Sequence, residues 1–272
     1  MCALWAISSA EAVQLPALVM PPVPPDGEKS AGWGVAWYEQ GDVHRVREAV
    51  SSGSTLRPLW LSDERCCARL FVGHLHQAGN EETLRNTQPF QRESGGVVHL
   101  FAHSGQLSRF IHNPKRFPVG HFRPLGETDS ERAFCVLMAR LAALWQDGRP
   151  DPDVRLAIVA DFAARLRSLG PATFLYSDGE LLFAHSDVRR QADQVVSEGL
   201  YQWQVNLGRE ADQGAPVGSL EGAMTMLTSA PADCLSWQPL PEGEVMMFRD
   251  GRLLDSCPRL TLWHEAMAAL EE

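Results

Sequence analysis

The sequence predicts an α+β fold in which mostly antiparallel sheets pack against helices. Three features support this class. Short β-rich segments come first, two amphipathic helical segments follow, and β-rich segments return after them. Tight-turn signals interrupt several of the β-rich segments, which is typical of antiparallel hairpins. Strands and helices do not alternate along the chain, so a doubly wound parallel sheet is not expected.

The first β-rich segments lie in the N-terminal part of the chain. Residues 33–49 alternate between apolar and polar side chains and break at Gln40–Asp42, which predicts a hairpin. Residues 69–78 and 95–105 are two further short apolar segments, and each ends in a loop that contains histidine. The proline-rich stretch 15–32 predicts a surface excursion, because proline fits neither a central strand nor a helix interior.

Two helices are expected next, in residues 127–148 and 151–171, because apolar side chains recur there at helical spacing. Asp129 or Ser130 is the expected N-cap of the first helix, and Gly170-Pro171 ends the second. The apolar positions are Phe134, Leu137, Leu141 and Leu144 in the first helix and Val154, Ile158, Phe162, Leu166 and Leu169 in the second.

Two more hairpins are expected after the helices. Residues 172–186 contain a turn signal at Ser177–Gly179, and residues 243–256 contain another at Asp250-Gly251. These hairpins complete the order of strands, two helices and strands on which the predicted fold class rests.

Composition and charge exclude several classes of protein. The 272 residues are 44% hydrophobic and 21% charged, which is typical of a globular domain. The net charge of -10 argues against a nucleic-acid partner, since phosphate binding depends on clustered Lys and Arg. No basic residue precedes Lys29, Glu11 interrupts the apolar start, and no segment is long enough for a membrane span. We therefore expect a cytoplasmic protein that does not bind membranes.

The cysteines do not form a metal or redox motif. None of the six belongs to a C-x-x-C pair, so neither a cysteine-rich zinc site nor a thioredoxin-type pair is expected. Reduced thiols and no cofactor are expected. The six cysteines are Cys2, Cys66, Cys67, Cys135, Cys234 and Cys257.

Five stretches of the sequence resemble a known family when they are taken together. They are Met1-Cys2, "GWGVAWYE" at 32–39, "GHLHQA…NTQPF" at 73–90, "FAHSGQL" at 101–107 and "GETDSERAF" at 126–134. In this order and spacing they resemble class-II glutamine amidotransferase domains, especially the stand-alone YafJ-like branch. The resemblance runs from residue 1 to about residue 145, with a weaker continuation after residue 170.

The resemblance implies both a fold and a domain organisation. The fold is an Ntn-hydrolase sandwich of four layers, αββα, with two mostly antiparallel sheets. The whole chain, residues 1–272, would form a single glutamine amidotransferase type-2 domain. Since this leaves no second domain to use ammonia, we expect ammonia to be released or passed to a separate subunit.

The resemblance also implies a catalytic group built on Cys2. After removal of Met1, Cys2 would carry both a thiol nucleophile and a free α-amine, whose usual pKa of about 7.7–8.0 suits a general base. The thiolate would attack a side-chain amide and form a thioester, and ammonia would leave. Gly105 matches the family, whereas Ser104 stands where the family has an asparagine that donates to the oxyanion.

Four more residues match the substrate-binding positions of the family. Asp129 matches the partner of the substrate α-amine, and His74 and His103 match family histidines. His76 stands where the family has an arginine that holds the α-carboxylate. Histidine offers fewer donors than arginine and is largely neutral at pH 7. Gln88 replaces another family histidine.

These departures leave alternatives to a glutaminase or γ-glutamyl amide hydrolase. A catalytically impaired member that binds a ligand or a protein fits the residues at His76 and Ser104, and it also fits a chain that retains Met1. A histidine metal site is the third possibility, because His74 and His76 on one strand would direct both rings to the same face. Six of the nine histidines lie between residues 74 and 121: His74, His76, His99, His103, His112 and His121.

Overall fold

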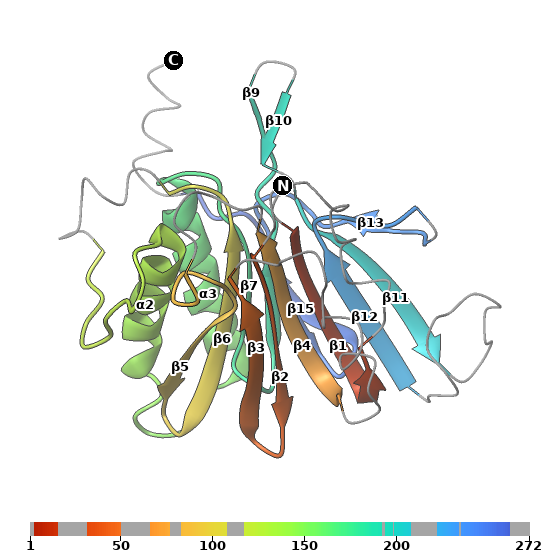
Figure 1. The fold of residues 1–272 in the computed structure, drawn as a ribbon, viewed down its shortest axis with the longest axis horizontal. Coiled ribbons are helices and arrows are strands. Elements are labelled where there is room, and N and C mark those ends of the chain that lie inside the picture. Colours follow the sequence, from red (N-terminus) through yellow and green to blue (C-terminus); the bar gives the residue numbers. More distant parts are fainter. Residues whose placement is uncertain are drawn as a thin grey trace.

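A computed structural model describes most of the chain and shows two sheets stacked face to face with helices on one side (Figure 1). The residues that the structure describes are 3–15, 32–49, 66–76, 83–107, 117–191, 194–197, 199–207, 222–233 and 235–261. Cys2 and Met1 therefore lie outside the described residues, as do His112 and Cys234.

One sheet has seven strands in the order β13-β11-β12-β1-β4-β2-β3. Its neighbouring strands pair antiparallel, as the sequence predicts. The strands are β1 (Ala3–Gln14), β2 (Gly32–Glu39), β3 (Asp42–Glu48), β4 (Cys67–His76), β11 (Tyr201–Leu207), β12 (Gly222–Thr228) and β13 (Gln238–Pro239).

The other sheet has six strands in the order β15-β14-β8-β7-β6-β5, also antiparallel. Its strands are β5 (Phe90–Ser94), β6 (Val97–Ser104), β7 (Thr173–Ser177), β8 (Leu182–His185), β14 (Val245–Arg249) and β15 (Arg252–Cys257). The strands β9 (Arg189–Gln191) and β10 (Gln194–Ser197) form a separate hairpin that projects beyond the ends of the sheets (Figure 1).

The predicted hairpins are confirmed, and local turn chemistry explains them. Glu39 pairs with Asp42, so Gln40 and Gly41 form a two-residue loop, and both have positive φ (52° and 87°). This backbone matches the twist of an antiparallel pair, and glycine adopts it without strain. The β14–β15 hairpin turns in the same way at Asp250 and Gly251.

Alternation along the strands separates three apolar layers. Leu4 and Ala6 of β1 lie in the cluster between the two sheets, while Trp5 and Ile7 lie in the cluster on the outer face of the seven-stranded sheet. The third cluster joins the other face of the six-stranded sheet to the helices, through side chains such as Phe101. The gap between the sheets is therefore apolar along most of its length.

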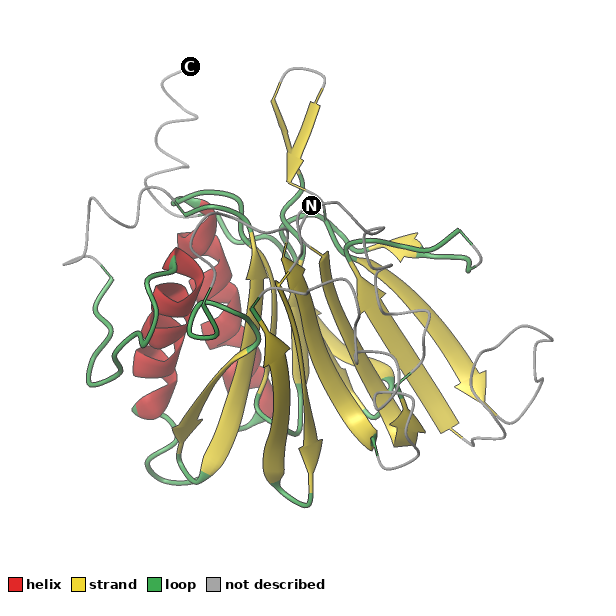
Figure 2. Cartoon of the chain, in the orientation of Figure 1, coloured by secondary structure: helices red, strands yellow, loops and turns green. Residues whose placement is uncertain are grey.

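Helices α2 (Asp129–Ala142) and α3 (Pro152–Arg167) cover the outer face of the six-stranded sheet (Figure 2). The part of the chain that the structure describes places no helix on the outer face of the seven-stranded sheet, so it accounts for three of the four expected layers. Neither α2 nor α3 is long and apolar enough to cross a membrane, and no other helix among the described residues is.

Two details of the predicted helices are wrong. The N-cap of α2 is Thr128, whose side-chain oxygen accepts from the Glu131 amide, and not Asp129 or Ser130. Val154 of α3 is 42% exposed. The predicted apolar positions 154, 158 and 162 advance by four residues, which turns each about 40° further around the helix than the last. The series therefore starts outside the buried face of α3 and reaches it only at Phe162, beside Leu156 and Val159.

Candidate functional site

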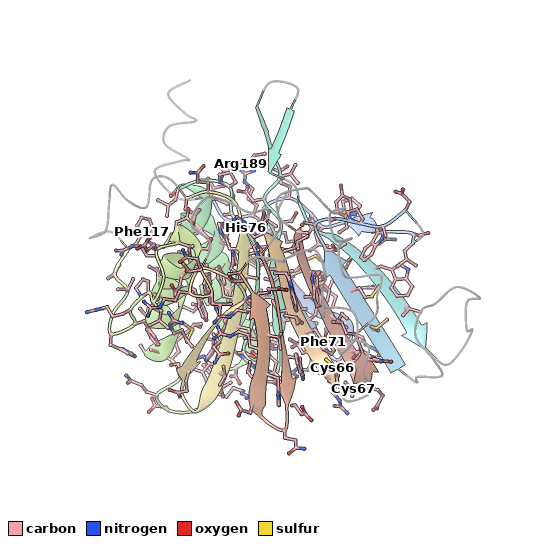
Figure 3. All side chains as sticks on the ribbon, viewed as in Figure 1. Cys66, Cys67, Phe71, His76, Phe117 and Arg189 are labelled. Atoms are coloured by element: carbon pink, nitrogen blue, oxygen red, sulfur yellow. The ribbon has the colours of Figure 1, made fainter. Side chains whose placement is uncertain are left out.

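A pocket of about 280 Å³ lies where β4 and β6 end. Six of the seven predicted site residues line this pocket. The seventh, Cys2, lies outside the described residues. Figure 3 shows His76 at this end of the sheets and Cys67, which begins the same strand, at the other end next to Cys66. The six residues are His74, His76, His103, Ser104, Gly105 and Asp129.

His74 and His76 enter the pocket from the seven-stranded sheet. They alternate in step with Val72, which packs in the cluster between the sheets. Their rings are stacked, with centroids 6.0 Å apart; His74 is buried and His76 is exposed. Ser104 ends β6 in the opposite sheet, in step with the buried Ala102 of the same cluster. The two sheets therefore contribute to the pocket from opposite sides.

Gln88 ties the loop before β5 to the end of β6. Its Oε1 accepts from the backbone N–H of His103 at 2.7 Å, and its Nε2 donates to the carbonyl of the same residue at 3.0 Å. These two bonds fix the orientation of the amide, so Nε2 is also the atom 3.5 Å from His74 Nε2. The sequence indicated only that Gln88 replaces a family histidine and did not predict this contact.

His103 is held on the helix side of β6. Its Nε2 lies 3.2 Å from the carbonyl oxygen of Pro171, which can only accept, so Nε2 carries the proton of the neutral ring. Nδ1 then accepts from Ser130 Oγ at 2.9 Å. Burial lowers the pKa of His103 to about 4, which keeps the ring neutral near pH 7. Both ring nitrogens are thus bonded within the protein, and the predicted contact of His103 with substrate stays a prediction.

Asp129 presents one carboxylate oxygen to the loop after β6 and keeps capacity on the other. Oδ2 accepts from the Leu107 amide at 2.6 Å, while Oδ1 lies 3.3 Å from Ser130 Oγ. The hydroxyl of Ser130 has a single proton, which His103 Nδ1 requires. Asp129 Oδ1 can therefore accept from a cationic ligand at the rim of the pocket.

The loop in front of α2 is fixed by a buried carboxylate and an amide. Glu131 accepts from the Leu125 and Gly126 amides at 3.1 and 2.6 Å and pairs with Arg92 at 2.5 Å. Asn86 Oδ1 accepts from the Glu127 amide at 2.9 Å. These contacts position Thr128 and Asp129 without involving either side chain, and none was predicted from the sequence.

Gly105 occupies a position where no side chain fits. Its φ is +140°, and an ideal Cβ there would lie 2.1 Å from the carbonyl oxygen of Pro171. Because the obstacle is backbone, it cannot be relieved by a change of rotamer. The Ser104-Gly105 segment is therefore packed directly against the turn at Pro171.

We expect Gly105→Ala to lower the free energy of unfolding by more than the roughly 1–3 kcal/mol typical of a strained backbone. The matched control is Gly148→Ala, since Gly148 has a φ of +114° and open space around its Cβ position. Urea unfolding of both variants separates the clash from the backbone strain. Equal losses in the two variants would contradict the tight packing of Gly105.

The buried histidines should make stability depend on pH. Burial lowers the pKa of both His103 and His185 to about 4 from the usual 6.5. Between these values the unfolded chain binds more protons, so the free energy of unfolding should fall as pH drops from 6.5 towards 4. Each histidine contributes up to about 1.4 kcal/mol per pH unit.

Urea unfolding between pH 6.5 and pH 5 measures this effect above the range where most carboxylates titrate. His185→Gln should remove part of the slope, and the same change at the exposed His121 serves as the control. A free energy of unfolding that stays constant over this interval would show that the two rings are not kept neutral by folding.

The described residues give no support to a histidine metal site. Among them, no group of three or more His, Cys, Asp and Glu side chains could hold a metal ion. His99 bonds to Tyr176 Oη at 2.7 Å and to the Ser94 carbonyl at 3.2 Å, and the ring of His121 packs against Phe122 at an interplanar angle of 33°. These two histidines therefore do not lie in the pocket with His74 and His76.

Comparison with solved structures first identifies the fold. The two antiparallel sheets with helices on one side correspond to the Ntn-hydrolase fold. A glutamine phosphoribosylpyrophosphate amidotransferase from B. subtilis matches 94% of this chain over 48% of its own, with a TM-score of 0.59 and 14% identity, which supports the fold alone. A family model then identifies the family. The model named glutamine amidotransferases class-II matches residues 1–270, so the chain belongs to this family.

Three more similar relatives were found, and the names of two of them agree with this assignment. A protein described as a predicted glutamine amidotransferase from Pseudomonas aeruginosa PA01 is 25% identical, with a TM-score of 0.69 over 93% of this chain and 100% of that one. YafJ of Escherichia coli K12, whose name places it provisionally among glutamine amidotransferases, is 32% identical over 58% of this chain and 61% of its own. An uncharacterised protein of Methanocaldococcus jannaschii is 27% identical over 85% and 64%. The chain thus spans less than two thirds of the curated relatives it matches.

Proposed function

We propose that the chain is an amidohydrolase that uses Cys2 to release ammonia from glutamine or another γ-glutamyl amide. The observation that carries the proposal is the convergence of His76, Ser104, Gly105 and Asp129 on one pocket. Family membership supports a glutamine-type small molecule as the substrate. We further propose that residues 1–272 act as one domain, in the cytoplasm, with ammonia released or passed to a separate subunit.

The position of β1 supports a role for Cys2 in this pocket. Ala3, to which Cys2 is bonded, begins β1 and pairs with Leu75, between His74 and His76. The next residue, Leu4, is fixed by its amide, which donates to Ser229 Oγ at 3.0 Å. Because consecutive Cα atoms are about 3.8 Å apart, chain connectivity alone keeps a nucleophile at residue 2 within reach of this end of the sheets.

In the proposed reaction, the α-amine exposed by loss of Met1 takes the proton of the Cys2 thiol. The thiolate sulfur forms a bond to the amide carbon, and the carbonyl oxygen becomes an oxyanion. The Ser104 hydroxyl and the Gly105 N–H donate to that oxygen. The carbon–nitrogen bond then breaks and the amine returns the proton, so that ammonia leaves and a thioester remains. Water cleaves the thioester and releases the carboxylic acid.

In the same proposal, the two charged groups on the α-carbon of glutamine bind to two residues that line the pocket. Asp129 Oδ1 accepts from the α-ammonium group, since Oδ2 is the oxygen that accepts from the Leu107 amide. His76 contacts the α-carboxylate in place of the family arginine. Since a neutral histidine gives one donor where arginine gives a charged pair, this contact is weak, and the Michaelis constant for glutamine should be high.

The residues at His76 and Ser104 also favour a second candidate, a catalytically impaired member that binds a ligand or a protein. Ammonia release from glutamine distinguishes the two, with protein whose intact mass shows that Met1 has been lost. Turnover supports the amidohydrolase. Protein that is inert, and that stays inert when His76→Arg and Ser104→Asn are combined, would support the impaired relative instead.

A further inference from the structure

An ion pair between Asp187 and Arg189 binds the turn between α3 and β7. Asp187, which is 4% exposed, accepts at Oδ2 from the Ala172 amide at 3.0 Å and from Arg189 Nε at 2.9 Å. Arg189 Nη2 in turn donates to the carbonyl oxygens of Arg167 at 2.5 Å and Gly170 at 2.8 Å. The two side chains therefore fix three backbone groups within six residues of chain.

The front of this turn lies against the wall of the pocket. The Pro171 carbonyl accepts from His103 Nε2 at 3.2 Å and occupies the space that a Cβ on Gly105 would need. On the other side of the contact, a Cβ on Gly170 would lie 2.1 Å from the carbonyl oxygen of Gln106. Backbone meets backbone at both points, so a shift of the turn moves the His103–Gln106 segment with it.

Asp187 also reaches the strand that neighbours Ser104. Its amide donates to Thr173 Oγ1 at 3.0 Å, and Thr173 is the residue paired with Ser104 in the β6–β7 register. Figure 3 shows Arg189 at the same end of the sheets as His76. The ion pair thus connects to Ser104 through Thr173 and to Gly105 through Pro171. Neither Asp187 nor Arg189 is among the described residues that line the pocket.

We infer that Asp187 and Arg189 are positioning residues that place the Ser104 and Gly105 donors for the developing oxyanion. This inference rests on the proposed function and adds two residues to it. Oxyanion donors act only when they lie at the correct distance from the charge as it forms, and a displacement of about 1 Å can cost roughly a hundredfold in rate. His76 lies in the other sheet. Asp129 begins α2 and meets residues 103–107 through the Leu107 amide, so loss of the pair should lower kcat more than it changes KM.

The chain contains a matched control for this inference. Asp178, in the turn at the other end of the β7–β8 hairpin, is also buried, accepts from Arg155 at 2.8 Å, and accepts from the Leu181 amide at 2.9 Å. Asp187 and Asp178 therefore share burial, an arginine partner and a backbone donor. They differ in that the turn held by Asp187 contacts the pocket wall.

The test compares Asp187→Asn with Asp178→Asn in ammonia release and in thermal unfolding. We expect Asp187→Asn to lower kcat roughly ten- to a hundredfold with KM changed less than about threefold. Asp178→Asn should lower the melting temperature at least as much and keep kcat within about threefold. Arg189→Gln is the second variant if Asp187→Asn does not fold, and it should reproduce the loss of kcat. Equal losses of kcat in the two aspartate variants, or none in either, would overturn the inference.

Hydrogen exchange separates this inference from the proposed function. Amides in residues 103–107 should exchange faster in Asp187→Asn than in wild type or in Asp178→Asn, because their support at Pro171 is loosened. Unchanged exchange in Asp187→Asn would overturn the inference even in an active enzyme. An inert wild-type protein would instead overturn the proposed function, while the exchange comparison would still decide whether the pair positions this segment.

Discussion

Cys2→Ala should abolish ammonia release and leave the fold unchanged. The thioester route depends on the sulfur, and alanine offers no nucleophile, so the rate should fall by at least roughly a thousandfold. The measurement is ammonia release at saturating glutamine by protein that has lost Met1. Circular dichroism and the melting temperature confirm that the variant is folded.

Cys67→Ala is the matched control, because Cys67 is a thiol at the far end of β4 from His76 (Figure 3). Its turnover should equal that of wild type. Turnover that survives Cys2→Ala would contradict the assignment of the nucleophile. If that residual activity were lost to a chelator, a metal-dependent reaction would replace the thioester mechanism.

His76→Arg should raise kcat/KM for glutamine about ten- to a hundredfold. An arginine at this exposed position of the pocket can form a charge-assisted, bidentate contact with the α-carboxylate, worth on the order of 1.5–3 kcal/mol. Each ~1.4 kcal/mol corresponds to a factor of ten. The gain should be in KM, because the carboxylate contact is the same in the ground and transition states.

The control is the same substitution at His44, an exposed histidine of β3 that stacks on Trp37 and does not line the pocket. It adds the same charge to the protein without a contact to substrate. An unchanged KM in His76→Arg, or an equal gain in His44→Arg, would show that residue 76 does not meet the carboxylate.

The antiparallel fold could be predicted because local residues determine it. Gly41 and Gly251 adopt positive φ in tight turns, and such turns join only antiparallel strands, so each hairpin is specified within a few residues. The N-cap of α2 could not be chosen in this way, since Thr128, Asp129 and Ser130 are all good caps and stand side by side. The backbone direction that brings Asp129 to Leu107 decides between them.

The predicted residues of the pocket carried a sequence signal, whereas their supports did not. His76, Ser104 and Asp129 were found because they belong to motifs that resemble a family. The bonds from Gln88 to His103 and from His103 to Ser130 join residues that are 15 and 27 positions apart in the chain. No motif in the sequence links these side chains. Such contacts depend on how separate elements meet in space, and spacing along the chain does not reveal them.

The position of β1 in the sheet determines how long this strand waits for a neighbouring strand during synthesis. β1 lies between β4 and β12, and Trp5 pairs with Thr228, about 220 residues later in the chain. At roughly 5–20 residues per second, a ribosome needs roughly 10 to 45 seconds to make that stretch. During this interval the first strand has no partner on its β12 side, and the N-terminus has already emerged. If Met1 is removed, as the proposed function requires, an aminopeptidase can therefore act before β12 joins the sheet beside β1.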